Sequence, residues 1–250
     1  MAWLALAFLL TAGLYASVGF GGGSTYTALL ALAGVDPKIL PTISLLCNII
    51  VVTGGSLRYA VAGEVAWKRV LPLVAVSAPL ALLGGLTPIK QQSFMLILAL
   101  SLVLAGLLLL VQGNRHVQRA PVRTRGNSFD LLAGAATGYL AGLVGIGGGI
   151  FLAPLLHLTR WGSPRAIAAT SSVFILINSL FGLAGQIAKN GTSVMATALA
   201  PYWPLAFAVL IGGLIGNYAS LRLLSQALVR RATAVLILYV GGQLLWKQLG

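Results

Sequence analysis

The sequence predicts an all-α polytopic membrane protein with two inverted repeats, each a glycine-broken re-entrant helical hairpin plus three transmembrane helices. Three observations support this fold class. Hydrophobic residues make up 58% of the chain and charged residues only 8%, whereas soluble domains carry about 25% charged residues. A glycine-rich break interrupts the apolar pattern twice, and the second half of the chain repeats the first.

Composition also limits the function. The net charge is +13, but the basic residues gather in short loops between apolar segments, as the positive-inside rule expects. We therefore expect no nucleic-acid partner. Cys47 is the only cysteine and His116 and His157 are the only histidines, so we expect no disulfide, no metal site and no cofactor. The sequence has no serine–histidine–acid set and no phosphate loop, so we expect no enzyme.

The first apolar segment, residues 3–18, ends at a glycine break, residues 19–24 (Gly-Phe-Gly-Gly-Gly-Ser), and a short helix should follow to about residue 34. The second break is residues 145–150 (Gly-Ile-Gly-Gly-Gly-Ile). Consecutive glycines usually stop a helix. In a bilayer, the freed backbone groups must face protein or a water-filled cavity. We therefore predict that the two breaks face each other near the middle of the membrane and line a substrate site.

The remaining elements follow the apolar pattern. A turn is expected before residue 39, because Pro37 forces Asp36 out of the helical region. The further segments of the first half are residues 39–58, 70–86 and 94–111. Those of the second half are residues 131–144, a short helix to about 159, and residues 167–188, 194–221 and 233–246. The predicted domains are residues 1–112 (first repeat), 113–128 (basic cytoplasmic linker) and 129–250 (second repeat).

The repeat is visible in the residue numbers. Gly145 lies 126 positions after Gly19, and Ser171 lies 127 positions after Ser44. The pair Gly212-Gly213 lies 128 positions after Gly84-Gly85. A slowly drifting offset indicates duplication with small insertions, which is a sequence signature of secondary transporters.

Two topologies compete. If each broken unit is a re-entrant hairpin, each half crosses the membrane three times and the second half is inverted. With the arginine-rich linker in the cytoplasm, this arrangement places 12 of the 16 Lys and Arg residues inside. A plain eight-span arrangement places nine inside and seven outside. The positive-inside rule favours the inverted repeats, with both termini outside.

The breaks also suggest chemistry. A helix that starts directly after a glycine turn presents free N–H groups and the positive end of its dipole, which together bind anions. The alternative is that the glycines only allow close helix packing. The three acidic residues, Asp36, Glu64 and Asp130, fall at segment ends or in loops. Cation carriers and proton relays normally place a carboxylate within the membrane, so an anionic substrate is favoured.

The predicted substrate-binding residues belong to the two breaks and to the neighbouring helices. They are Gly21, Gly22, Gly23, Ser24, Ser44, Asn48, Arg58, Gly147, Gly148, Gly149, Thr170, Ser171 and Asn178. For the hydroxyl residues the alternative is a hydrogen bond to backbone or to a neighbouring helix. For Arg58 the alternative is an interfacial side chain that snorkels to the headgroups.

The glycine runs at residues 19–23 and 145–149 resemble the duplicated motif of the sulfite exporter TauE/SafE family. Residues 165–172 (Arg-Ala-Ile-Ala-Ala-Thr-Ser-Ser) resemble that family's segment ending in Ala-Thr-Ser, and residues 58–67 are similar to its loop after the second helix. The first copy departs from the pattern, with Pro-Thr-Ile-Ser at residues 41–44. The resemblance implies a multi-pass carrier of small sulfur-containing anions in the bacterial inner membrane.

We therefore predict a secondary transporter of sulfite or an organosulfonate that exports its substrate by alternating access. Efflux of an anion from a cell that is negative inside is favoured by about 2.3 kcal/mol per charge per 100 mV. The alternatives are an anion channel and a non-transporting membrane scaffold or assembly protein. The expected partners are a small anion, the lipid bilayer and, in a homodimer, a second copy of the chain.

Overall fold

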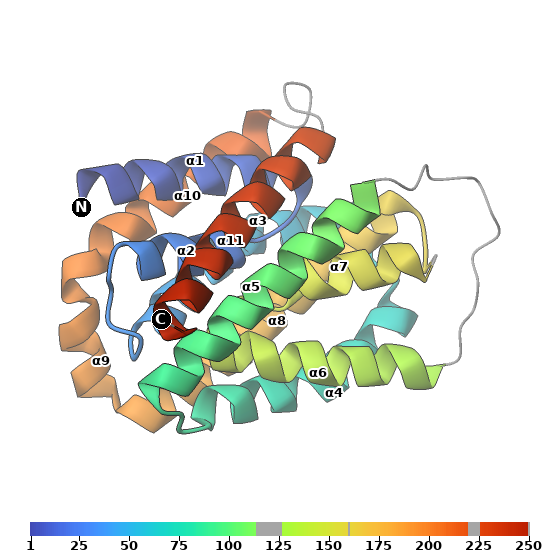
Figure 1. Cartoon of the computed structure of the whole chain (residues 1–250). Helices are drawn as coiled ribbons and strands as arrows, with labels where there is room; N and C mark the ends of the chain where they lie inside the picture. Colours follow the sequence, from blue (N-terminus) through green and yellow to red (C-terminus); the bar gives the residue numbers. More distant parts are fainter. Residues whose placement is uncertain (114–126, 160, 220–225, 250) are drawn as a thin grey trace.

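The computed structural model describes residues 1–113, 127–159, 161–219 and 226–249, and these residues contain helices and no strand (Figure 1). The helices of the first half are α1 (Ala2–Val18), α2 (Gly23–Leu32), α3 (Leu40–Val61), α4 (Trp67–Leu86) and α5 (Gln91–Gly113). Those of the second half are α6 (Asn127–Val144), α7 (Gly149–Leu158), α8 (Pro164–Asn190), α9 (Thr192–Leu199), α10 (Trp203–Ala219) and α11 (Gln226–Leu249). The all-α membrane class is confirmed, while residues 114–126 of the predicted linker lie outside the described residues.

Within the described parts of the chain, five helical stretches are long and apolar enough to cross a membrane. They are Leu40–Val61, Trp67–Leu86, Gln91–Val111, Arg165–Asn190 and Met195–Tyr218. The apolar parts of α1 and α6 are shorter than the ~20 residues that a crossing needs. This agrees with hairpins better than with eight plain spans. The inverted orientation of the second half stays a prediction.

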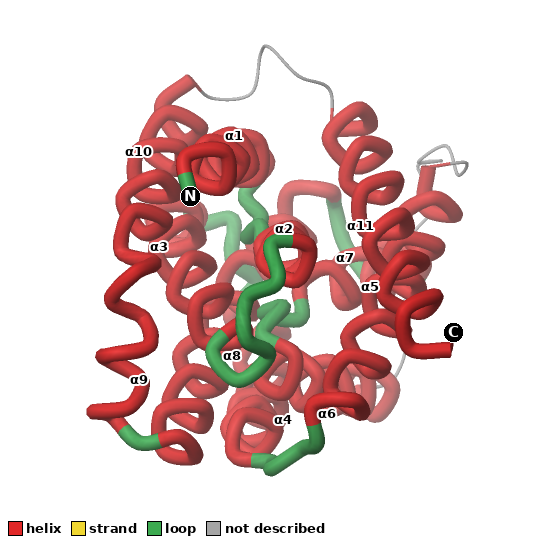
Figure 2. Tube along the Cα trace, turned by 60° about the vertical axis from the view of Figure 1, so that its left-hand side comes forward, coloured by secondary structure: helices red, strands yellow, loops and turns green. Residues whose placement is uncertain are grey.

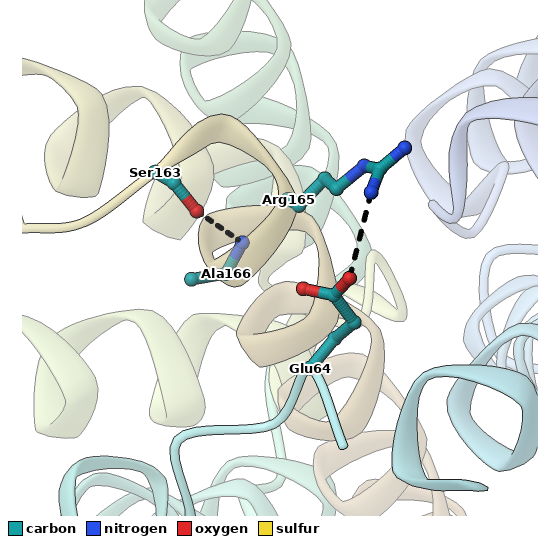
Figure 3. Close-up of polar contacts among 4 residues, drawn as sticks. All are labelled: Glu64, Ser163, Arg165 and Ala166. Atoms are coloured by element: carbon teal, nitrogen blue, oxygen red, sulfur yellow. Dashed lines mark hydrogen bonds and ion pairs between the residues drawn. The ribbon is translucent and has the colours of Figure 1, made fainter. Parts of the chain in front are cut away.

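Local sequence explains the helix ends near the site. α8 begins at Pro164, which suits the first helical position because its missing N–H would have no partner there. The Ser163 hydroxyl caps this start by accepting a hydrogen bond from the Ala166 N–H at 3.2 Å (Figure 3). The expected segment at residues 194–221 is divided by a short 3-10 turn, Ala200–Tyr202, which contains Pro201. α10 begins directly after this turn, at Trp203, with Pro204 in its first turn.

The two halves pack by exchanging partners. α1 lies along α10, and α6 lies along α4 (Figures 1 and 2). By the repeat offset, α6 is the counterpart of α1 and α10 is the counterpart of α4. α5 packs against its own counterpart α11, and α3 packs against α8. Each half therefore completes the packing of the other.

One end of the molecule is held together by polar and aromatic contacts between the halves. The Arg69 guanidinium lies 3.8 Å from the ring centre of Trp161 and donates to the Trp161 carbonyl oxygen at 2.6 Å. Nearby, the carboxylate of Glu64 pairs with Arg165 at 3.7 Å (Figure 3). Exposed ion pairs contribute about 0–1 kcal/mol, so the contact of Arg69 at the start of α4 with Trp161 in the α7–α8 loop is the stronger link between the halves at this end.

Candidate functional site

The two glycine breaks differ in backbone conformation. α1 ends at Gly19, whose φ is 79° and whose N–H donates to the Ala16 carbonyl oxygen at 3.2 Å. In the second break Gly145, Gly147 and Gly148 all have positive φ, at 82°, 78° and 77°. L-residues rarely adopt this left-handed region, because Cβ approaches the following carbonyl. Backbone conformation alone therefore requires glycine at three positions of the second break and at one position of the first.

The two breaks touch each other. Gly23 opens α2, and a Cβ added to it would collide with the Ile146 carbonyl oxygen of the second break. The side chain of Asn48 bridges the same region, with Nδ2 donating to the Ile146 carbonyl oxygen at 3.3 Å. The prediction that the breaks face each other is therefore confirmed. Their contact is so close that any side chain at Gly23 would separate them.

Asn48, on α3, lies between the breaks and is fully buried. A Cβ on Gly21 would lie 2.6 Å from Asn48 Oδ1, and one on Gly147 would lie 2.7 Å from Asn48 Nδ2. Among the residues that the structure describes, Oδ1 has no hydrogen-bond partner. A buried amide oxygen without a partner costs about 1–3 kcal/mol, and such groups mark places where water, an ion or a ligand binds.

Ile175, on α8, lies in the same place from the other half, since it follows Asn48 by the 127-residue offset. Its Cγ2 would lie 3.2 Å from a Cβ on Gly21 and 3.0 Å from one on Gly147. Ile175 also covers Gly149 at the start of α7, just as Asn48 contacts Gly23 at the start of α2. Equivalent positions of the two repeats thus meet at the centre, one polar and one apolar.

Ser179 is a second residue that the sequence analysis did not place in the site. Its Oγ would lie 3.1 Å from a Cβ on Gly147, and this buried hydroxyl has no hydrogen-bond partner. Its counterpart is Val52, whose Cγ1 would lie 3.0 Å from a Cβ on Gly21. The repeat offset could have identified both residues. Position 48 plus 127 is Ile175, and Ser179 is one helical turn further along α8.

Three predicted residues of α8 share this environment in part. The hydroxyls of Thr170 and Ser171 are fully buried and have no hydrogen-bond partner. Asn178 donates from Nδ2 to the Phe174 carbonyl oxygen at 2.8 Å, while its Oδ1 has no partner. Ser171 is one turn before Ile175 on the same helix face. α8 therefore carries several buried polar atoms that nothing in the described structure satisfies.

Other predicted residues have structural contacts. Ser44 donates to the Gly23 carbonyl oxygen at 3.0 Å and lies 2.9 Å from Thr27, which donates to it. Gly22 and Gly148 pack away from the contact between the breaks. A Cβ on Gly22 would lie 2.9 Å from Thr11 Cγ2, and one on Gly148 would lie 3.0 Å from the Thr137 carbonyl oxygen. Ser24 is buried in the first turn of α2.

Arg58 lies apart from the contact between the two breaks. It is ten residues beyond Asn48 on α3, which corresponds to about 15 Å along the helix. Its Nη1 donates to the Asn217 carbonyl oxygen at 3.1 Å, and its guanidinium lies 5.7 Å from the ring centre of Tyr59. The interfacial alternative fits this position better than a contact at the centre.

The starts of α2 and α7 contribute positive electrostatic potential at the centre. The first N–H groups of α2 and α7 have no partner within their helices, and both helix starts carry the positive end of a dipole. Among side chains that the structure describes, none of the groups contacting the breaks is acidic. A duplicated pair of broken helices meeting inside a bundle of apolar helices is typical of polytopic membrane transporters with discontinuous helices.

Comparison with known proteins gives the particular family. The model of the family described as "Sulfite exporter TauE/SafE" matches residues 4–244. The chain is 33% identical over 249 residues to "Probable membrane transporter protein y4hK" of Sinorhizobium fredii, covering 97% of both chains. It is 27% identical over 260 residues to "Probable membrane transporter protein YunE" of Bacillus subtilis, covering 92% of both. No solved structure matches the chain. The chain belongs to the TauE/SafE family of multi-pass membrane transporters.

Proposed function

We propose that this protein is a secondary transporter that exports a small sulfur-containing oxyanion, sulfite or an organosulfonate, across the bacterial inner membrane. The observation that carries the proposal is the contact between the two glycine breaks, with the amide of Asn48 between them. The sulfur chemistry comes from the family name and not from any single contact.

The anion would be held by backbone and neutral side-chain groups. The starts of α2 and α7 supply free N–H groups and positive dipole ends, while Asn48 and Ser179 supply an amide and a hydroxyl. Such a site needs no buried lysine or arginine, and it disfavours cations because no carboxylate neutralises them. Arg58 then acts near the surface and not at the centre.

The closeness of the breaks bears on the mechanism. Gly23 and Ile146 touch with no space for a side chain between them, so an anion at this point requires the halves to separate locally. We propose alternating access, in which one half moves against the other around this contact. Export needs no coupling ion, because the membrane potential favours anion efflux by about 2.3 kcal/mol for each negative charge and each 100 mV.

Flux in proteoliposomes tests the function. Purified protein should move sulfite or an organosulfonate such as sulfoacetate, and should show counter-transport between labelled and unlabelled anion. A channel would conduct orders of magnitude faster and show no counter-transport. Movement of a cation, with no anion transported, would overturn the proposal.

Asn48→Ala tests the site. We expect the apparent KM for the anion to rise about 10- to 100-fold, because a hydrogen bond to a charged group is worth about 1.5–3 kcal/mol. Thr53→Ala is the matched control, since Thr53 is on the same helix, is exposed and donates only to the Ile49 carbonyl oxygen. Equal kinetics for the two variants would remove Asn48 from the site.

A further inference from the structure

Arg58 is a partly buried cation that no described carboxylate neutralises. At this end of the molecule the ion pair joins Glu64 to Arg165, which leaves Arg58 without an acidic partner in the described part of the chain. Arg58 contacts α10 instead, where its Nη1 donates to the Asn217 carbonyl oxygen at 3.1 Å. A guanidinium has five N–H donors, so this bond uses only a fraction of its capacity.

The side chain of Asn217 places a second polar group beside the same stretch of α3. Its Nδ2 lies 2.7 Å from a Cβ built on Gly54, and Gly54 is one helical turn before Arg58. Its Oδ1 is buried and has no hydrogen-bond partner among the described residues. A buried polar atom without a partner marks a place where water, an ion or a ligand binds. The carboxamide is therefore free to turn its donors toward a ligand.

Tyr59 links Arg58 with the beginning of the first break. A Cβ built on Gly19 would collide with the hydroxyl and ring of Tyr59, and the Arg58 guanidinium lies 5.7 Å from the centre of that ring. Close by, the hydroxyls of Ser56 and Ser172 are hydrogen-bonded at 2.9 Å and join α3 to α8. A ligand at Arg58 would thus lie one side chain away from the first residue of the break.

The repeat does not build the same pair of groups at the equivalent end of α8. By the offsets of 127 and 128 residues, the counterpart of Arg58 is Gly185 and that of Asn217 is Ile89. A Cβ on Gly185 would collide with a carbonyl oxygen of α4, so that interface has no space for a long side chain. Lys189, one turn further on, donates to a carbonyl oxygen at the end of α4 at 3.5 Å. A guanidinium with a neighbouring carboxamide is therefore a feature of the first repeat.

We propose that Arg58 and Asn217 form a second anion-binding site, where the transported oxyanion binds before it reaches the two breaks. This inference rests on the proposed anion transport. A guanidinium fork binds two oxygens of a sulfite or sulfonate group at once, and the carboxamide donates to a third. The end of α10 carries partial negative charge on its last carbonyl oxygens, so it holds the guanidinium in place without neutralising it.

The experiment measures sulfite flux into proteoliposomes for variants of both residues. Arg58→Gln should raise the apparent KM about tenfold, since a hydrogen bond to a charged group is lost, and should leave kcat within about twofold. Arg58→Lys keeps a point charge and should raise KM only about threefold. Asn217→Asp is nearly isosteric and gives Arg58 a carboxylate that competes with the anion, so KM should rise about tenfold while thermal stability does not fall.

Lys68→Gln is the matched control, because Lys68 is exposed at the start of α4 near the same end of the molecule. It removes the same charge and should change KM by less than about twofold. An equal rise in Lys68→Gln would mean that surface charge in general attracts the anion, and the Arg58–Asn217 site would be wrong. Asn217→Asp keeps the test decisive if Arg58→Gln does not fold.

A lipid phosphate has the same oxyanion chemistry, so the assays use vesicles of phosphatidylcholine alone and with added phosphatidylglycerol. A KM rise in both kinds of vesicle supports binding of the free anion. If Arg58→Gln changes only the dependence of flux on phosphatidylglycerol, or if Arg58→Gln and Asn217→Asp both keep the wild-type KM, the second site is wrong although anion transport stands. If wild type moves no anion, the proposed function fails as well.

Discussion

Two equivalent helix interfaces differ in how closely they approach. In the α4·α8 interface, a Cβ on Gly85 would collide with the Gly182 carbonyl oxygen and lie 3.0 Å from the Gly185 Cα. In the α10·α3 interface, the equivalent Gly213 would meet only Val51, at 3.7 Å from its Cα, which is ordinary van der Waals contact. The same duplicated glycine is therefore indispensable in one interface and replaceable in the other.

This difference shows that duplicated sequence does not produce identical packing. Small residues let membrane helices approach closely, and both interfaces retain glycine. Only α4 and α8, however, approach so closely here that a Cβ would not fit between them. Under the proposed alternating access, the two interfaces exchange these arrangements during transport. Gly213 would then be needed in the conformation that is not represented by this structure.

The largest expected effect tests this exchange. Gly85→Ala should destabilise this conformation by about 1–3 kcal/mol, the typical cost of overpacking, and reduce flux at least tenfold. Gly213→Ala should leave thermal stability within about 0.5 kcal/mol and still slow transport. Thermal unfolding of the purified variants, together with proteoliposome flux, measures both quantities. Full wild-type flux in Gly213→Ala would contradict the exchange.

The next effect compares the two breaks. Gly147 has a φ of 78°, whereas its counterpart Gly21 is not among the residues with positive φ. Alanine in the left-handed region costs about 1–2 kcal/mol more than glycine, so Gly147→Ala should lose more thermal stability than Gly21→Ala. A larger loss for Gly21→Ala would show that contact with Asn48, and not backbone conformation, dominates at these positions.

The smallest effect concerns the paired serines. Ser44→Ala removes a buried hydrogen bond to the Gly23 carbonyl oxygen and should lower stability by about 1 kcal/mol. Ser171→Ala removes a hydroxyl that has no partner, so stability should hardly change. If Ser171 contacts the anion, the apparent KM should rise in this variant alone. An unchanged KM would mean that Ser171 is merely buried.

Much of the fold could be read from the sequence, since the breaks, the helix order and the repeat all follow from glycine runs and apolar spacing. The site was harder to predict. α8 carries buried polar residues on more than one side, so its sequence does not say which face meets the breaks, and Ile175 and Ser179 were missed. Ser44 and Ser171 look equivalent, but Thr27 joins Ser44 in bonding to Gly23, and alanine stands at the equivalent position 153.

The exchange of partners between the halves also affects how the chain is made. α1 leaves the ribosome well before its partner α10, which begins only at Trp203. Until then the small-residue face of α1, including Gly13, lacks the helix that covers it. Insertion of α1 therefore precedes its final packing by the time that the ribosome takes to synthesise the chain from α1 to α10. In a fragment that ends after α5, α1 and α4 would both lack the helices of the second half against which they pack.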